Sequence, residues 1–137
     1  MTALIRGVFD ADLPGVLELW QLAAAEPTHT DDLEALRALF QHDPGSVLVA
    51  DAEGQLVGSV IAAWDGWRGS IYRLVVLPNE RRHGLGRQLL SAAQARLESL
   101  GARRLQAIVV ESDDRAIGFW RASAWEEQSE RRRFVLG

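Results

Sequence analysis

A short segment in the middle of the chain combines arginine, histidine and glycine in a pattern that suits the binding of an anion. It consists of Arg81, Arg82, His83, Gly84, Leu85 and Gly86. A run with helical spacing follows at once, and the first amides of a helix lack partners within it and lie at the positive end of its dipole. Glycine has no Cβ atom to keep a phosphate from the backbone. The segment predicts a phosphate site; a glycine-rich turn that binds nothing is the alternative.

Two familiar phosphate-binding loops do not fit this segment. A Walker loop needs Gly-Lys-Ser/Thr, which is absent, and a dinucleotide fingerprint would need glycine at Leu89. Arg81, Arg82 and Arg87 can add charge-assisted contacts to a phosphate. We therefore expect an anion site of another kind.

The composition limits which other sites the chain can hold. With 137 residues it is the size of one domain, 1–137, and it contains no cysteine, which excludes disulfides, thiolate-bound metals and a cysteine nucleophile. His29, His42 and His83 are too dispersed to predict a metal site. The net charge is −4 and the arginines are scattered among acids, so we expect no nucleic-acid partner. No apolar run is long enough for a membrane span and no signal peptide is evident, so we expect a cytoplasmic protein without membrane contact.

Hydrophobic spacing and turn residues divide the chain into strands and helices. The pattern predicts helices over 13–24, Asp31–His42, Gly84–Leu100 and Asp113–Ala122. It predicts strands at Ala3–Phe9, Val47–Ala52, Leu56–Trp64, Ile71–Leu77, Arg104–Val110, and near Trp125–Gln128 and Arg133–Leu136. The order is β-α-α-β-β-β-α-β-α-β-β. Hairpins combined with one strand–helix–strand crossover indicate an α+β fold on one mixed, mostly antiparallel sheet flanked by helices.

Three segments in this order resemble the GNAT superfamily of N-acetyltransferases. Arg81-x-x-Gly84-x-Gly86 matches the family signature Gln/Arg-x-x-Gly-x-Gly/Ala between a strand and a long helix. Leu74–Pro78 is similar to the lead-in that precedes this signature. Asp113–Trp125 resembles a further family segment, Asn-x-x-Ala-x-x-Phe-Tyr-x-x-x-Gly-Phe. The resemblance covers most of the chain and implies the GNAT fold, with acetyl-coenzyme A as co-substrate and no metal.

The resemblance also implies roles for single residues. Backbone amides across Arg81–Gly86, together with Arg87, would hold the pyrophosphate of coenzyme A. Backbone groups of Val75, Val76 and Leu77 would pair with the pantetheine arm, and an amide there would stabilise the oxyanion. Asp113 stands where the family has an asparagine that contacts pantetheine, and Trp120 is a further residue of the cofactor site.

The chain departs from the family at the residues that transfer protons. Trp120 replaces a tyrosine that serves as general acid, and an indole N–H can donate a hydrogen bond but has no accessible proton to transfer. Either the thiolate leaves unassisted or Tyr72 serves, although a strand tyrosine can also be a packing residue. Ser70 stands where some members carry a glutamate, which leaves Asp65, Glu111 and Glu18 as candidate general bases, or as solvated carboxylates.

The sequence thus predicts transfer of an acetyl group to a primary amine by direct attack in a ternary complex. The acceptor would be a small amine, an amino acid derivative or a peptide N-terminus, with Trp20 and Trp67 as candidates to line its pocket. Acetylation of a ribosomal or other protein N-terminus is one alternative, and a non-catalytic acyl-coenzyme A binder or interaction module is another. Exposed strand edges near the C-terminus favour a homodimer.

Overall fold

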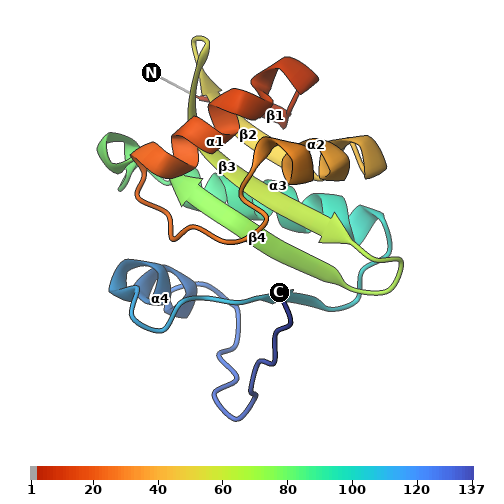
Figure 1. The fold of residues 1–137 in the computed structure, drawn as a ribbon. Helices are drawn as coiled ribbons and strands as arrows, with labels where there is room; N and C mark the ends of the chain where they lie inside the picture. Colours follow the sequence, from red (N-terminus) through yellow and green to blue (C-terminus); the bar gives the residue numbers. More distant parts are fainter. Residues whose placement is uncertain (1–2) are drawn as a thin grey trace. The chain divides into compact units, whose positions relative to one another are not determined.

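The computed structural model describes residues 3–137 (Figure 1), and residues 3–107 form a five-stranded sheet with helices on its two faces. The strands are β1 (Leu4–Gly7), β2 (Val47–Ala52), β3 (Gln55–Trp64), β4 (Gly69–Val76) and β5 (Leu105–Ala107). The helices are α1 (Leu13–Leu22), α2 (Leu33–His42), α3 (Leu85–Ser99) and α4 (Asp114–Arg121), and the short 3₁₀ turns are η1 (Asp10–Asp12) and η2 (Pro78–Glu80).

The sheet is mixed, and its strand order follows the sequence from β1 to β5. Neighbours from β1 to β4 are antiparallel, while β4 and β5 are parallel and are joined through the crossover helix α3. In Figure 1 helices α1 and α2 lie on one face of the sheet and α3 on the other. The predicted mixed, mostly antiparallel sheet flanked by helices is confirmed.

Helix α3 packs against the sheet through one apolar side. Leu85, Leu89, Ala93 and Leu97 are all buried on this side, at the helical spacing that the sequence predicts. Two strand glycines make room for the helix: a Cβ atom on Gly69 would lie 2.7 Å from Leu97 Cδ1, and one on Gly58 would lie 2.9 Å from Leu89 Cδ1. Helix α3 therefore lies close against β3 and β4.

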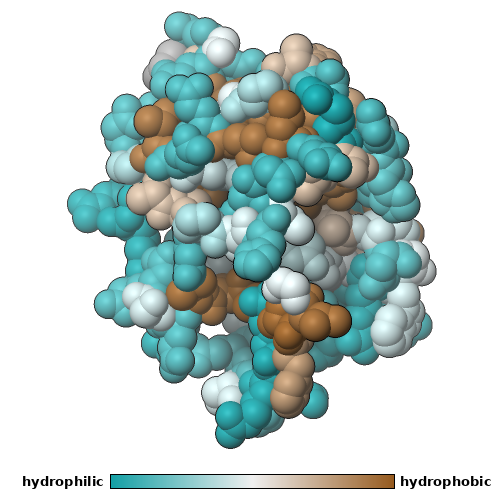
Figure 2. Space-filling model, in the orientation of Figure 1, coloured by the Kyte–Doolittle hydropathy of each residue, from teal (hydrophilic) through white to brown (hydrophobic). Residues whose placement is uncertain are grey.

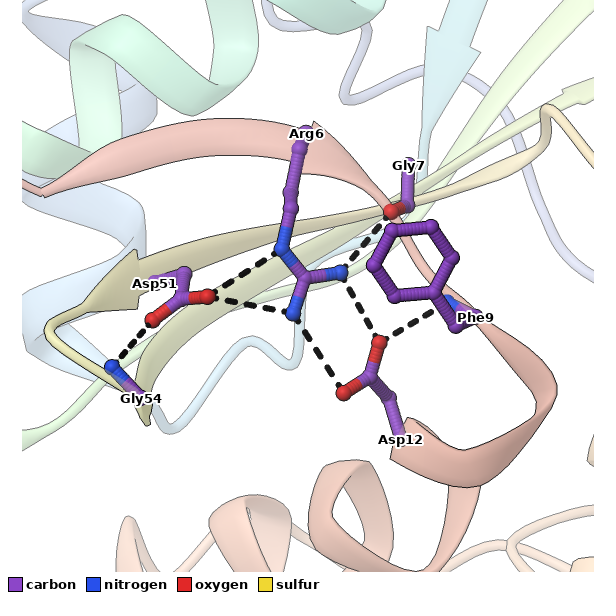
Figure 3. A network of polar contacts seen from close by, with 6 residues as sticks. All are labelled: Arg6, Gly7, Phe9, Asp12, Asp51 and Gly54. Carbon is purple, nitrogen blue, oxygen red and sulfur yellow. Dashed lines mark hydrogen bonds and ion pairs between the residues drawn. The ribbon is translucent and has the colours of Figure 1, made fainter.

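A charged network joins β1, β2 and the start of α1 (Figure 3). Arg6 Nη1 donates to Asp12 Oδ2 at 2.8 Å, and Arg6 Nε donates to Asp51 Oδ2 at 3.2 Å. The side chain of Asp12, the residue before α1, does not cap this helix. Asp12 instead accepts from the backbone N–H of Phe9 at 2.8 Å and from Arg6. The carboxylate thus ties the β1–α1 turn together.

Residues from Ile108 to Gly137 form a second compact unit, distinct from the unit that ends at Ala107. This unit contains α4. The rings of Trp120 on α4 and Trp125 after it lie 4.8 Å apart between centroids. Arg121 Nε of α4 donates to Glu127 Oε1 at 2.7 Å. The strands predicted near Trp125–Gln128 and Arg133–Leu136 are wrong, because neither segment forms a strand. A strand needs a partner, and residues 108–137 contain no strand that could provide one. The strand predicted over Arg104–Val110 is shortened to β5.

The surface is mainly hydrophilic where Figure 2 shows it. Hydrophobic residues appear on this face only as separate patches among hydrophilic ones (Figure 2). Within residues 3–137, no helix is long and apolar enough to cross a membrane.

Candidate functional site

The segment after β4 forms an open turn that leads into helix α3. Two of its residues have left-handed backbone conformations, Arg82 with φ 71° and Gly84 with φ 79°. A Cβ atom on Gly84 would meet no atom within 4 Å, so the space in front of this residue is open. Helix α3 begins at Leu85, which is buried and anchors the turn to the core. The predicted glycine loop is therefore a turn at a helix start with free space before it.

The start of α3 differs from the starts of α2 and α4 in its hydrogen bonds. Asp32 caps α2 by accepting from Ala35 N at 2.7 Å, and Asp113 caps α4 by accepting from Ala116 N at 3.0 Å. The residue before α3 is Gly84, and no side chain in the described part of the chain caps this helix. The first amides of α3 are therefore left for solvent or for an anion.

Two arginines and a histidine belong to this helix start. Arg82, His83 and Arg87 are exposed, and no described carboxylate lies within ion-pair distance of Arg82 or Arg87. Arg81 instead turns back toward the strand, where its Nε donates to the carbonyl of Val76 at 3.2 Å. Open helix amides with two unpaired guanidinium groups beside them make an arrangement suited to a pyrophosphate.

One edge of β4 is open along most of the strand. Strand β5 pairs with β4 only from Gly69 to Ile71, so the edge beyond Ile71 has no partner strand among the described residues. From Ile71 to Val76 this open edge is about 17 Å long, at about 3.3 Å per residue. An extended ligand arm of this length could lie along it.

The backbone groups of β4 alternate between the two edges of the strand. Leu77 N donates to Val57 O at 2.9 Å and so faces β3, as does Val75, two residues earlier. The alternation turns the N–H and C=O of Val76 toward the open edge, where its carbonyl accepts from Arg81. Of the three residues expected to pair with the pantetheine arm, Val76 is thus the one with its backbone on the open edge.

A β-bulge interrupts the pairing of β3 with β4. Ser59 is opposite Val75 and Ile61 is opposite Tyr72, so two residues of β4 face the single residue Val60 of β3. Arg73, one of the two, has a left-handed conformation with φ 51°. Its carbonyl accepts from the hydroxyl of Ser59 at 2.9 Å. The bulge is therefore held by a buried side chain.

Among the candidate proton-transfer residues, Tyr72 lies beside this bulge. It is opposite Ile61, which shares a sheet face with Ser59, and Ser59 is bonded to Trp20 of α1. The Tyr72 side chain is therefore on the face covered by α1, and the residue is 50% exposed. The position suits a group that meets a ligand, not one sealed in the core.

Asp65 lies at the opposite end of β4, in the turn between β3 and β4. Its Oδ1 accepts from Arg68 N at 2.7 Å and from Trp67 N at 2.8 Å. These backbone hydrogen bonds, first that of Arg68, lower the pKa of Asp65 below its usual value, which makes its carboxylate a weaker base. The structure thus gives Asp65 the role of a turn residue and separates it from the loop at 81–86 by the length of the strand.

The remaining candidates lie in the second unit, Ile108–Gly137. Glu111 is exposed, and Asp113 uses its carboxylate to cap α4. Trp120 is half-buried within this unit, in an edge-to-face contact with Trp125. Their roles toward a cofactor or substrate stay predictions.

The two tryptophans expected at an acceptor pocket have different surroundings. Trp20 is 5% exposed, and its indole N–H donates to Ser59 Oγ at 2.9 Å. Trp67 is 70% exposed and lies under the guanidinium of Arg68 at 4.2 Å from the ring centroid. The sequence reasoning missed Ser59 and Arg73 altogether, because only the register of β3 against β4 reveals the bulge that they share.

The chain matches the model of the acetyltransferase (GNAT) family over residues 13–124. An acetyltransferase of Pectobacterium atrosepticum is 34% identical over 116 residues, which cover 84% of this chain and 82% of that protein. An acetyltransferase of Yersinia enterocolitica is 34% identical over 125 residues, covering 90% and 88%.

Solved structures share the fold. That of Ard1 from Thermoplasma volcanium has a TM-score of 0.78 at 21% identity, over 88% of this chain and 80% of that one. The structure of AAC(6')-Iy in complex with a bisubstrate analogue has a TM-score of 0.78 at 22% identity, over 100% and 99%.

Proposed function

The chain belongs to the acetyltransferase (GNAT) family and is an acetyltransferase, and on this premise we propose that it transfers the acetyl group of acetyl-coenzyme A to a primary amine by direct attack in a ternary complex. The observation that carries the proposal is the uncapped start of α3 next to the open edge of β4, where Arg82 and Arg87 have no ion-pair partner among residues 3–137. The helix start would hold the pyrophosphate and the strand edge would receive the pantetheine arm.

The chain's own groups suggest how the reaction would run. The lone pair of the neutral amine attacks the thioester carbonyl, and a backbone amide of β4 near the bulge stabilises the oxyanion. The C–S bond then breaks as the carbonyl re-forms, and the amine nitrogen loses its proton to a base or to water. Tyr72, exposed beside the bulge, would protonate the departing thiolate. Glu111 would be the base, and Asp113 and Trp120 would contact the cofactor.

The ligands bound to two neighbours in fold point the same way. AAC(6')-Iy is an aminoglycoside N-acetyltransferase seen with coenzyme A and with the bisubstrate analogue CoA-S-monomethyl-acetylneamine. An N-acetyltransferase from Thermoplasma acidophilum is seen with coenzyme A. These ligands support a small-molecule amine as acceptor and acetyl-coenzyme A as donor for this chain as well.

Two glycines at opposite ends of α3 allow a matched test of cofactor binding. Gly84 and Gly101 both have positive φ, 79° and 106°, and a Cβ atom on either would meet nothing within 4 Å. Alanine at each therefore costs a similar backbone strain, about 1–2 kcal/mol. Calorimetry with acetyl-coenzyme A should show that Gly84→Ala weakens binding at least about tenfold, a loss of about 1.4 kcal/mol, while Gly101→Ala leaves it unchanged. Equal affinities in all three proteins would contradict the proposed pyrophosphate site.

Release of the free thiol of coenzyme A, measured with a panel of amines and N-terminal peptides, distinguishes the proposed function from its alternatives. Turnover with small amines supports the proposal, whereas turnover with peptides alone would assign a protein N-terminal acetyltransferase. Binding of acetyl-coenzyme A without turnover of any acceptor would favour a non-catalytic module. The panel also measures which acceptor class the site prefers.

A further inference from the structure

Arg73 combines an unusual backbone with a side chain that reaches a distant segment. It is at the bulge of β4, and its φ of 51° is rare for a residue with a long side chain. Its carbonyl accepts from Ser59 Oγ at 2.9 Å, and Ser59 in turn accepts from Trp20 Nε1 at 2.9 Å. Ser59 is fully buried, so this chain of hydrogen bonds fixes the bulge from within the core.

The side chain of Arg73 holds the connection between α1 and α2, residues 23–32. Its Nε donates to Asp31 Oδ1 at 3.1 Å, and its Nη2 bonds the second oxygen of the same carboxylate. Nη2 also donates to the carbonyl of Glu26 at 2.7 Å. The guanidinium carbon lies 5.2 Å from the ring centroid of Trp20. A single side chain therefore ties both arms of the connection to the sheet.

This ion pair is shielded from solvent. The side chains of Arg73 and Asp31 are 15% and 16% exposed, whereas those of the surface pair Arg37 and Asp10 are 39% and 61% exposed. A shielded, two-point pair with an additional backbone contact contributes more than an exposed pair. In Figure 1 the connection, in orange, runs across the sheet in front of β4.

Arg73 lies where the acetyl end of a donor bound along β4 would be. From a pyrophosphate at the start of α3, an arm along the open edge of β4 runs back past Val76 toward the bulge. The acetyl end of the donor would then lie near Arg73. An acceptor that reaches it from the α1 face must pass the connection 23–32, because Arg73 holds that connection over the bulge.

We propose that Arg73 is a positioning residue that fixes the connection 23–32 as one wall of the acceptor site and sets the affinity for the acceptor amine. The inference rests on the proposed function, because it takes the acetyl end of the donor to lie at the bulge. The backbone and the side chain of Arg73 then have separate roles. The backbone forms the bulge, and the side chain positions the connection 23–32 that borders the acceptor site.

Replacement by glycine separates these two tasks. Arg73→Gly keeps a residue that tolerates positive φ and keeps the carbonyl that Ser59 binds, but it removes every side-chain bond to the connection. We expect the KM for the acceptor to rise at least about tenfold, as expected for the loss of a hydrogen-bonded charged group. The affinity for acetyl-coenzyme A, measured by calorimetry, should stay within about twofold of the parent. Arg73→Lys keeps the charge but loses the planar guanidinium with its several donors. Its KM for the acceptor should therefore lie between those of the parent and of Arg73→Gly.

Hydrogen exchange tests the anchor without relying on catalysis. Amides in residues 23–32 should exchange faster in Arg73→Gly and in Asp31→Asn, while those of α3 keep the parent rates. In the double variant these amides should exchange no faster than in Arg73→Gly alone, since the two side chains act as a pair. Arg37→Ala, which removes the exposed pair with Asp10, is the matched control and should leave the acceptor KM and the exchange of 23–32 unchanged.

The outcomes distinguish this inference from the proposed function. Unchanged exchange in 23–32 overturns the anchor, and faster exchange with an unchanged acceptor KM overturns the positioning role. A rise in the KM for acetyl-coenzyme A equal to that for the acceptor would mean a general structural effect and also overturns it. If the parent protein turns over no amine at all, the proposed function fails first and the acceptor role of Arg73 fails with it.

Discussion

Arg6 Nη1 on β1 lies 2.8 Å from Asp12 Oδ2 at the end of η1, and this hydrogen bond holds the pKa of Asp12 below its usual value. The same guanidinium also bonds Asp51 of β2, so one cation joins two strands and the turn into α1. Helix α1 carries Trp20, whose indole bonds Ser59 opposite the bulge. The network of Figure 3 therefore supports the face on which the acceptor would bind.

The acid sensitivity of the fold should depend on Asp12. Because the folded pKa is lowered from 3.8, the stabilisation is present above the unfolded pKa and is lost as the pH falls through the folded pKa. Asp12→Asn should lower the free energy of unfolding by about 1.5–3 kcal/mol near neutral pH, the range for a hydrogen bond to a charged group. The difference from the parent should shrink as the pH falls below 3.8 and through the folded pKa. Urea unfolding across this pH range measures it, and a difference that is independent of pH would contradict the assignment.

The packing of α3 on the sheet should tolerate no side chain at residue 69. A Cβ atom on Gly69 would lie 2.7 Å from Leu97 Cδ1, so Gly69→Ala should destabilise the fold by about 1–3 kcal/mol through overpacking. Gly7→Ala, also on a strand but with nothing within 4 Å of the added atom, is the control and should be nearly neutral. Equal unfolding midpoints for the two variants would show that α3 moves freely to make room.

The sequence predicts the central elements well because local signals surround them. Strand β2 has the predicted bounds, Val47–Ala52, since turn residues stand on both sides of it, and the helix predicted over Gly84–Leu100 forms as α3, Leu85–Ser99. The anion site expected at the start of α3 rests on arginines, glycines and a helix start that are likewise neighbours in the chain, and it stays a prediction. These features depend on residues that are close to one another in the chain.

The features that the sequence missed depend on contacts between distant residues. The bulge at Arg73 follows from the register of β4 against β3, and the bond from Ser59 to Arg73 spans fourteen positions. The strand predicted near Arg133–Leu136 fails for a related reason: a short apolar run does not show whether a partner strand exists. Phe134 and Leu136 remain exposed in the structure, and the predicted homodimer stays a prediction.

Binding of acetyl-coenzyme A should depend on the exposed arginines of the loop. Arg82→Ala and Arg87→Ala should each weaken binding by up to about fivefold, since exposed ion pairs contribute about 0.2–1 kcal/mol. The effect should shrink with added salt, because salt screens exposed charges. Arg103→Ala and Arg104→Ala, exposed arginines beyond α3, serve as controls and should not change the affinity. Calorimetry at two salt concentrations measures these affinities. If Arg82→Ala and Arg87→Ala bind acetyl-coenzyme A as well as the control variants do, these arginines do not belong to the pyrophosphate site.

Substitutions at Tyr72 and at Asp65 should have different effects on the rate of proton transfer. Tyr72 is beside the bulge and half-exposed, whereas Asp65 is at the far end of β4 with its carboxylate bonded to the turn amides. We expect Tyr72→Phe to lower kcat by about a hundredfold, the lower limit for general acid–base catalysis, with little change in the KM for acetyl-coenzyme A. Asp65→Asn should leave kcat unchanged, because the hydrogen bonds that lower the pKa of Asp65 also make it a poor base at the pH of the reaction. Steady-state kinetics across the pH range separate the two residues. A full kcat in Tyr72→Phe would mean that the thiolate leaves without a general acid, as the modest pKa of a thiol permits.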